Sequence, residues 1–212
     1  MNIAGLFKFF KKDDKIFYDL FVESAVICEQ ASEEFLTVLE KGFDESSLPQ
    51  IRSFKHKSNK ILKKTLKMLN KTNNISLEHE DVGNIASMLN RITKKIVKAC
   101  INLKVYSIDK ISEDVVSQAK ILTLATKELT LITENFSSKK DINFLTDRNI
   151  KMKEFETRGD EIHYHALEQL FSGAYDALTV IKYRDIHKDT ESALDLCNDV
   201  SDAVTNVVYK QK

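Results

Sequence analysis

The chain has 212 residues, of which 42% are hydrophobic and 30% are charged, so it is too apolar for a disordered protein. Five glycines and one proline supply few tight turns, which argues against a strand-rich fold and favours long helices. The formal net charge is zero, so no global field draws the chain toward nucleic acid or anionic lipid. No apolar stretch approaches the ~18 residues of a transmembrane helix. We therefore expect an all-α protein without a membrane span.

The three cysteines and the opening segment are two further features of the sequence. Cys28, Cys100 and Cys197 are far apart and lack metal-ligand spacing, so we interpret them as buried thiols of a reducing compartment. The opening residues MNIAGLFKFFKK hold Phe7, Phe9 and Phe10 among lysines. This apolar run is too short for a signal peptide, which leaves an arm that packs on the protein or a segment that dips into a membrane surface.

Apolar residues recur at three- and four-residue spacing and predict three helices in the first half. The first spans residues 14–41 and ends at Gly42. Ser46, Ser47 and Pro49 then mark the start of a second helix over 48–69. Ser76 is the predicted cap of a third helix that runs to residue 106.

The second half predicts three more helices. The fourth covers residues 112–136, and Asp141 is the predicted cap of a fifth that runs to 171. The sixth extends over 174–209, with an interruption considered at 182–185. Short connections predict antiparallel packing of neighbours along the chain.

The six helices divide into two similar sets of three. The second aligns with the fifth and the third with the sixth through these pairs: Phe54 and Phe155, Ile61 and Ile162, Leu66 and Leu167, Leu69 and Leu170, Asp81 and Asp185, Val82 and Ile186, Ala99 and Ala203. No low-complexity linker separates the sets. We therefore predict one helical domain over 1–212 with approximate repeats 14–106 and 112–210.

Two carboxylate pairs stand at four-residue spacing in the second half. Glu156 and Asp160 share a face of the fifth helix, with His163 near that face, and Glu191 and Asp195 share a face of the sixth, followed by Asn198, Asp199 and Asp202. Converging carboxylates suit a hard or borderline cation. The alternative is a set of solvated helix faces, with His163 as a surface or packing residue.

The aligned positions of the first half are basic or neutral. Lys55 and Asn59 stand opposite Glu156 and Asp160, and residues 51–74 hold eight Lys or Arg and no acidic residue. Ser87 and Arg91 stand opposite Glu191 and Asp195. Such a stripe could bind phosphate groups or an acidic partner, or form a solvated face salt-bridged to the acidic half. It lacks interleaved aromatics and any nucleic-acid-binding motif, so we expect no nucleic acid partner.

Sequence motifs of common enzymes are absent. The chain has no GxxxxGK[ST], GxGxxG, HExxH or GxSxG. It has no ExxH of the di-iron oxidases, and Asp160 with His163 is the one near-match. We therefore expect a protein without enzymatic activity.

Three segments carry a resemblance to a known family: FKFFKKDDKIFYDLFVESA near the start, FETRGDEIHYHALEQLF, and IKYRDIHKDTESALDLCNDVSDAV. Over nearly its whole length the chain resembles the PhoU-like family of proposed phosphate transport regulators. The resemblance implies two three-helix repeats, metal binding through Glu-xxx-Asp motifs, and a companion role to low-affinity phosphate permeases. The implied metal ligands are Glu156, Asp160, Glu191 and Asp195, with Asp199 as a further candidate.

The departure from the family lies in the first repeat, where Lys55 and Asn59 replace an acidic pair, so we expect no metal site there. The resulting prediction is a non-enzymatic cytoplasmic accessory protein of phosphate transport, peripheral at the inner face of the membrane through a permease, with Fe, Mn, Zn or Mg in the second repeat. Two alternatives remain open: a metal-free interaction module whose acidic and basic faces pair between subunits, and a metal-dependent phosphohydrolase. Either role is compatible with a homo-oligomer.

Overall fold

Long α-helices form the whole of the described architecture. The computed structural model describes residues 12–42, 45–72, 75–136 and 142–210, and no strand occurs in these ranges. The predicted all-α fold is confirmed. The elements are α1 (Lys12–Lys41), the short 3-10 helix η2 (Glu45–Ser47), α2 (Leu48–Leu69), α3 (His79–Val105), α4 (Glu113–Phe136), α5 (Ile142–Leu170) and α6 (Ala177–Lys210).

Two details of the predicted helices are wrong. The interruption considered at 182–185 does not occur, because α6 continues through it. Ser76 does not cap α3, whose N-cap is Glu78. Instead, the backbone N–H of Ser76 donates to Asp14 Oδ1 at 2.9 Å and its hydroxyl donates to Asp14 Oδ2, because the α2–α3 connection returns to the start of α1. The predicted Asp141 cap and the first eleven residues lie outside the described residues.

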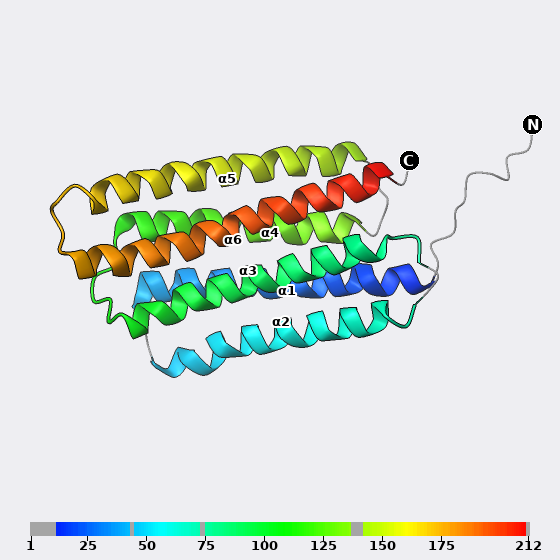
Figure 1. The fold of residues 1–212 in the computed structure, drawn as a ribbon, viewed down its shortest axis with the longest axis horizontal. Helices are drawn as coiled ribbons and strands as arrows, with labels where there is room; N and C mark the ends of the chain where they lie inside the picture. The colour runs from blue at the N-terminus through cyan, green and yellow to red at the C-terminus, as the bar shows by residue number, and fades with distance from the viewer. Residues whose placement is uncertain (1–11, 43–44, 73–74, 137–141, 211–212) are drawn as a thin grey trace, which may run out of the picture.

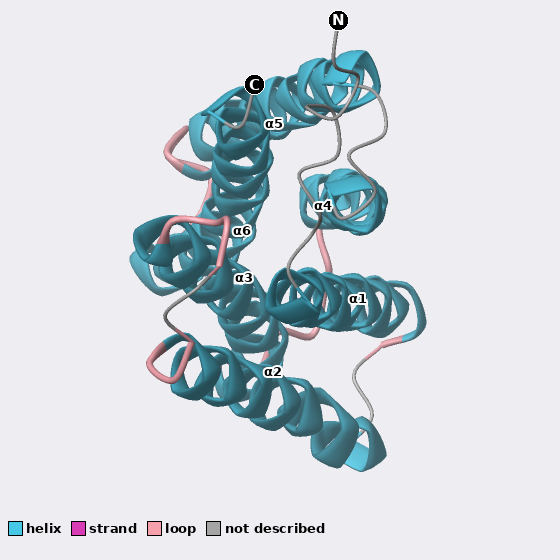
Figure 2. Ribbon diagram, turned by 90° about the vertical axis from the view of Figure 1, so that its right-hand side faces the viewer, coloured by secondary structure: helices cyan, strands magenta, loops and turns pink. Residues whose placement is uncertain are grey.

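The helices form two three-helix repeats that pack against each other. α3 lies on α6 and α1 lies on α4, so these four helices form the centre of the bundle. In the described residues α2 packs only on α1, α3 and η2, while α5 packs only on α4 and α6. Figures 1 and 2 show the result, with α2 and α5 on opposite outer edges. The predicted two-repeat bundle is confirmed.

The central pair α3 and α6 shows the repeat in its buried residues. Residues that the repeat alignment pairs between the two helices are buried in both. Besides Val82 and Ile186, these pairs are Leu89 and Ala193, Ile96 and Val200, and Leu103 and Val207. The two helices run antiparallel, with Asp81 beside Lys210 at one end and Tyr106 beside Asp185 at the other, and apolar burial drives the two repeats together. The aromatic part of the core lies between α1 and α4, where Tyr18 meets Phe136 edge to face at a centroid distance of 4.8 Å.

All three cysteines are free and buried, as the sequence predicts. Cys28 Sγ donates to the carbonyl of Leu89 at 3.3 Å. Burial raises the pKa of Cys28 and of Cys100 to about 12, so both are neutral thiols at physiological pH. No helix in the described ranges is long and apolar enough to cross a membrane.

Two buried carboxylates each bind a pair of cations across helices. Asp189 of α6 lies 3.0 Å from Lys95 Nζ and 2.9 Å from Lys98 Nζ, which ties α6 to α3. Glu128 of α4 lies 2.9 Å from Arg148 Nη1 and 2.7 Å from Lys151 Nζ, which ties α4 to α5. These ion pairs offset the free-energy cost of burying the two carboxylates away from water.

The two helical glycines should respond oppositely to alanine. A Cβ on Gly159 of α5 would lie 2.9 Å from Leu194 Cδ2, whereas a Cβ on Gly83 of α3 would meet Leu69 Cδ2 at an ordinary 4.0 Å. Gly83→Ala should therefore raise the free energy of unfolding by up to about 1 kcal/mol, because alanine is the better helix former. Gly159→Ala should show no gain, since Leu194 must move. Urea unfolding of the two variants checks this, and an equal gain at both sites would show that α5 and α6 are not held this close.

Candidate metal centre

The seam between α5 and α6 carries the acidic residues of the second repeat. Gly159 lets α5 approach α6, because its missing side chain leaves room for Leu194. Toward the start of α5 and the end of α6, Asn149 Nδ2 donates to Asp202 Oδ1 at 2.9 Å, and Ser201 Oγ donates to Asn149 Oδ1 at 2.8 Å. These contacts fix how the two helices face each other, and with them the placement of the carboxylates on the seam.

Three carboxylates from the two helices converge. Glu156 and Asp160 of α5 and Asp195 of α6 each place one oxygen so that all three lie within 4.8 Å of one another. All three side chains are half-buried. This is the one group of three or more potential metal ligands in the described parts of the chain. The spacing lets a single cation contact one oxygen of each residue.

The electrostatics of the cluster show uncompensated negative charge. Burial raises the pKa of Glu156, and the neighbouring charges of Asp160 and Asp195 raise it further. Burial also raises the pKa of Asp195 to about 6, with repulsion from Glu191 and Asp160 next in size. Lys153 acts in the opposite direction on Glu156, but its amino group lies 3.7 Å from Asp202. A bound cation would relieve this repulsion.

The other two candidate ligands lie outside the three-residue group. Glu191 lies one turn before Asp195 on α6, and its negative charge contributes to the raised pKa of Asp195. Asp199 is exposed and lines a separate groove between α3 and α6, of about 430 Å³, together with Asp81, Arg91 and Asp202. The direct ligand set that the geometry supports is therefore Glu156, Asp160 and Asp195.

A pair of histidines next to the cluster includes one that the sequence analysis missed. The His187 ring is buried and stacks on His163 at a centroid distance of 6.3 Å. Its Nδ1–H donates to Gln118 Oε1 at 2.8 Å, and burial lowers its pKa to about 4. His187 is thus a neutral imidazole beside the acidic seam. The spacing of His187, Glu191 and Asp195 at four-residue intervals was the available signal, because it places all three on one face of α6.

The corresponding region of the first repeat is occupied by neutral amides. Asn90 Nδ2 donates to Asn59 Oδ1 at 3.1 Å and to Ser58 Oγ at 2.9 Å. Lys55 is exposed, and Arg91, also exposed, lines the groove between α3 and α6. Amide and hydroxyl groups here bond to one another, which gives this seam no repulsion for a cation to relieve.

The acidic cluster should make the metal-free protein less stable at neutral pH. The pKa of Asp195 rises from 3.8 to about 6, so the folded state holds its proton more tightly than the unfolded state. The stabilisation from this group is complete below pH 3.8 and is lost as the pH rises through about 6. In EDTA, Asp195→Asn should therefore raise the free energy of unfolding at neutral pH by about 1 kcal/mol, an amount reduced for partial exposure. Urea unfolding at acidic and neutral pH measures this, and a variant destabilised at neutral pH would contradict it.

Comparison with known proteins identifies the fold. No family model matches the chain. Two solved structures from Shewanella oneidensis MR-1, described as a candidate PhoU-like phosphate regulatory protein and as a PhoU-like protein, superpose with TM-scores of 0.66 and 0.65. Each is 12% identical, and each alignment covers 94% of this chain and 98% of the solved chain. The chain has the PhoU-like fold.

A relative found by sequence also matches the chain over nearly its whole length. The chain is 24% identical over 204 residues to the UPF0111 protein YkaA of Bacillus subtilis (strain 168), which covers 94% of this chain and 98% of YkaA. The PhoU-like resemblance read from the sequence is confirmed by the fold. At 12% identity the superposition shows a shared backbone fold and says nothing of the side chains at the acidic cluster.

Proposed function

We propose that this PhoU-like protein is a non-enzymatic regulator of phosphate transport that docks on a phosphate permease at the inner face of the membrane. The observation that carries the proposal is the PhoU-like fold over 94% of the chain, shared with a structure described as a candidate phosphate regulatory protein. The alignment also covers 98% of that solved chain, which supports a likeness over the bundle and not over one part of it.

The proposal includes one cation bound by Glu156, Asp160 and Asp195. Oxygen ligands in this number suit Mg, Mn, Fe or Zn, with water completing the coordination. The raised pKa values of Glu156 and Asp195 support the assignment, because burial first, and then the charges of neighbouring carboxylates, disfavour their ionised forms, and a bound cation would offset both effects. A cation here would hold α5 to α6, so its role is to fix the surface of the second repeat.

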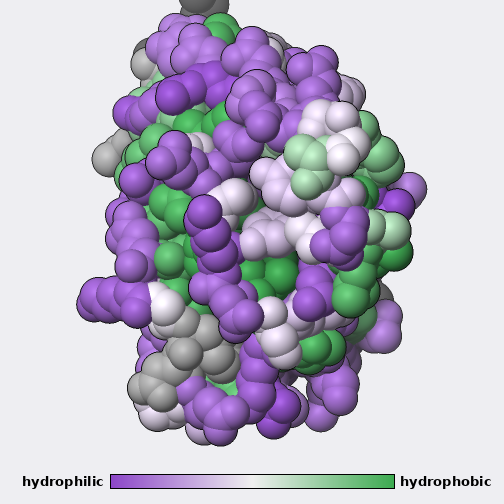
Figure 3. Space-filling model, turned by 90° about the vertical axis from the view of Figure 1, so that its left-hand side faces the viewer, coloured by the Kyte–Doolittle hydropathy of each residue, from purple (hydrophilic) through white to green (hydrophobic). Residues whose placement is uncertain are grey.

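The α5–α6 end of the bundle offers a surface for the permease. Large hydrophobic side chains are exposed here, and Figure 3 shows apolar patches on this end among polar ones. The backbone beneath them is ordered, since Asp176 Oδ1 accepts from the N–H of Leu178 at 2.9 Å and of Thr179 at 3.1 Å. Exposed apolar side chains on an ordered turn are typical of a protein contact surface. The exposed residues are Phe171, Tyr175, Leu178 and Ile181.

Affinity purification from native membranes tests the proposal. The tagged wild-type chain should recover a phosphate permease, whereas Leu178→Ser/Ile181→Ser should not. The matched control is Leu124→Ser/Ile150→Ser, which removes two exposed hydrophobic side chains from α4 and α5 and should still recover the permease. Failure of the wild-type chain to recover any permease, in phosphate-replete and in phosphate-starved cells, would overturn the docking proposal.

A further inference from the structure

The outward face of α2 is a continuous row of cations. Its buried face is formed by Ile51, Phe54, Ser58, Ile61, Thr65 and Leu69. The cations of α2, with Lys71 in the turn that follows it, occupy the sides of the helix that are not buried, so they form a broad stripe exposed to solvent. We call this set of exposed side chains the basic stripe; it consists of Arg52, Lys55, Lys57, Lys60, Lys63, Lys64, Lys67 and Lys71.

The charge of the basic stripe is not neutralised within the described residues. None of its eight cations forms an ion pair there, and α2 contains no acidic residue. The lysines that cross-link the repeats, among them Lys95 and Lys98 of α3 and Lys127 of α4, all lie outside the stripe. The zero net charge of the chain therefore conceals a strongly cationic outer edge, balanced by acids elsewhere.

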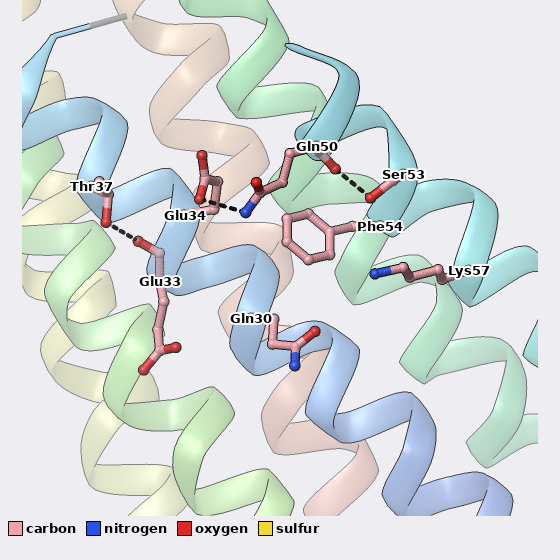
Figure 4. A pocket seen from close by; sticks show the side chains of 8 residues that line it. All are labelled: Gln30, Glu33, Glu34, Thr37, Gln50, Ser53, Phe54 and Lys57. Carbon is pink, nitrogen blue, oxygen red and sulfur yellow. Dashed lines mark hydrogen bonds between the residues drawn. The ribbon is translucent and has the colours of Figure 1, made fainter. Parts of the chain in front are cut away.

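The nearest acids of α1 are engaged with other groups. A groove of about 650 Å³ separates them from α2, and Figure 4 shows its walls. Glu34 Oε2 accepts from Gln50 Nε2 at 3.1 Å, and Glu33 lies 2.9 Å from Lys127 of α4. Lys57, at the rim of this groove, places its amino group 5.6 Å from the centroid of the Phe54 ring. Within the described residues, neither Glu33 nor Glu34 forms an ion pair with a cation of the stripe.

We propose that the basic stripe binds the surface of an anionic lipid bilayer and lays the edge of the bundle formed by α2 on it. α2 is an outermost helix of 22 residues, about 33 Å long, so its stripe can contact many lipid headgroups at once. Each lysine near an anionic bilayer adds a similar increment of attraction, and the increments add along a row. This inference does not depend on the permease.

The composition of the stripe favours lipid over an acidic protein. Seven of its eight cations are lysines, which act as flexible point charges and need no fixed partner geometry. Protein interfaces are depleted of lysine and enriched in aromatic residues and arginine. Leu66 is the one large hydrophobic side chain exposed on α2. A fluid layer of phosphate groups matches such a surface better than a folded protein does.

Vesicle co-sedimentation tests this with the full chain. The wild type should bind phosphatidylcholine vesicles in which about a third of the lipid is phosphatidylglycerol, and added salt should weaken the binding. Lys60→Gln/Lys63→Gln/Lys64→Gln/Lys67→Gln should weaken it at least about tenfold. The matched control replaces four exposed lysines on other helices and makes the same change in net charge: Lys120→Gln/Lys127→Gln/Lys153→Gln/Lys188→Gln. It should bind within about threefold of the wild type.

Four outcomes would overturn the inference, provided circular dichroism shows that each variant folds. Binding by the wild type to pure phosphatidylcholine to the same extent would assign the contact to apolar groups. Equal losses in both quadruple variants would assign it to net charge, and no loss in the α2 variant would place the contact outside the stripe, for example in the first eleven residues, which both variants keep. Salt-sensitive retention on polyglutamate without vesicle binding would assign the stripe to an acidic protein.

Discussion

Asp160→Asn/Asp195→Asn should remove the bound metal, from about one ion per chain in the wild-type protein to none. The change deletes two of the three carboxylates whose oxygens lie within 4.8 Å of one another. Loss of a group that merely orients a ligand costs ten- to hundredfold in metal affinity, so loss of two ligands should exceed about a hundredfold. Mass spectrometry of the purified proteins for metals, followed by titration with Mn, Fe, Zn and Mg, measures the result.

The control variants separate the cluster from general acidity. Glu161→Gln/Glu168→Gln removes two exposed carboxylates of the same helix and should leave the metal content unchanged. Asp199→Asn should also retain metal, because Asp199 lies in the groove between α3 and α6. In EDTA the double aspartate variant should be more stable than the wild type. No metal in any form of the protein, even after reconstitution, would reduce the cluster to a source of repulsion and favour a metal-free helical adaptor.

Lys95→Met/Lys98→Met should destabilise the fold by about 3 kcal/mol or more, because it leaves a buried carboxylate without a partner. Asp189 is 2% exposed, and its two oxygens lie 3.0 and 2.9 Å from the two lysine amino groups. The reverse change, Asp189→Asn, should cost less, since both lysines reach solvent once the carboxylate is gone. Urea unfolding of the purified variants measures both free energies.

A double-mutant cycle assigns the loss to the ion pairs. Adding Asp189→Asn to the double lysine variant should restore part of the lost stability, because it removes the unpaired charge. Lys94→Met/Lys188→Met is the control, as both lysines are exposed and form no ion pair within the described residues. Additive costs in the cycle would show that the pairs contribute little and that α3 and α6 are held by apolar packing alone.

Local chemistry explains why the helices could be predicted closely. The period of apolar residues and the scarcity of glycine and proline act within a few turns, so α2 occurs at its predicted bounds, Leu48–Leu69. The predicted N-cap of α3, Ser76, was wrong for a reason that lies outside the local sequence. Ser76 has the chemistry of an N-cap, but Asp14, far away in the sequence, binds both of its donors.

The sequence by itself determined the helices, the repeat, the buried thiols and the acidic spacing on α5 and α6, because each depends on neighbours along the chain. Only the tertiary structure decided which carboxylates meet, because Asp195 joins Glu156 and Asp160 through the close approach of α5 and α6 at Gly159. It also brought His187 against His163 and Gln118. The same holds for the basic stripe: the sequence shows eight cations, but the position of α2 at the outer edge and the engagement of nearby acids elsewhere leave them facing solvent.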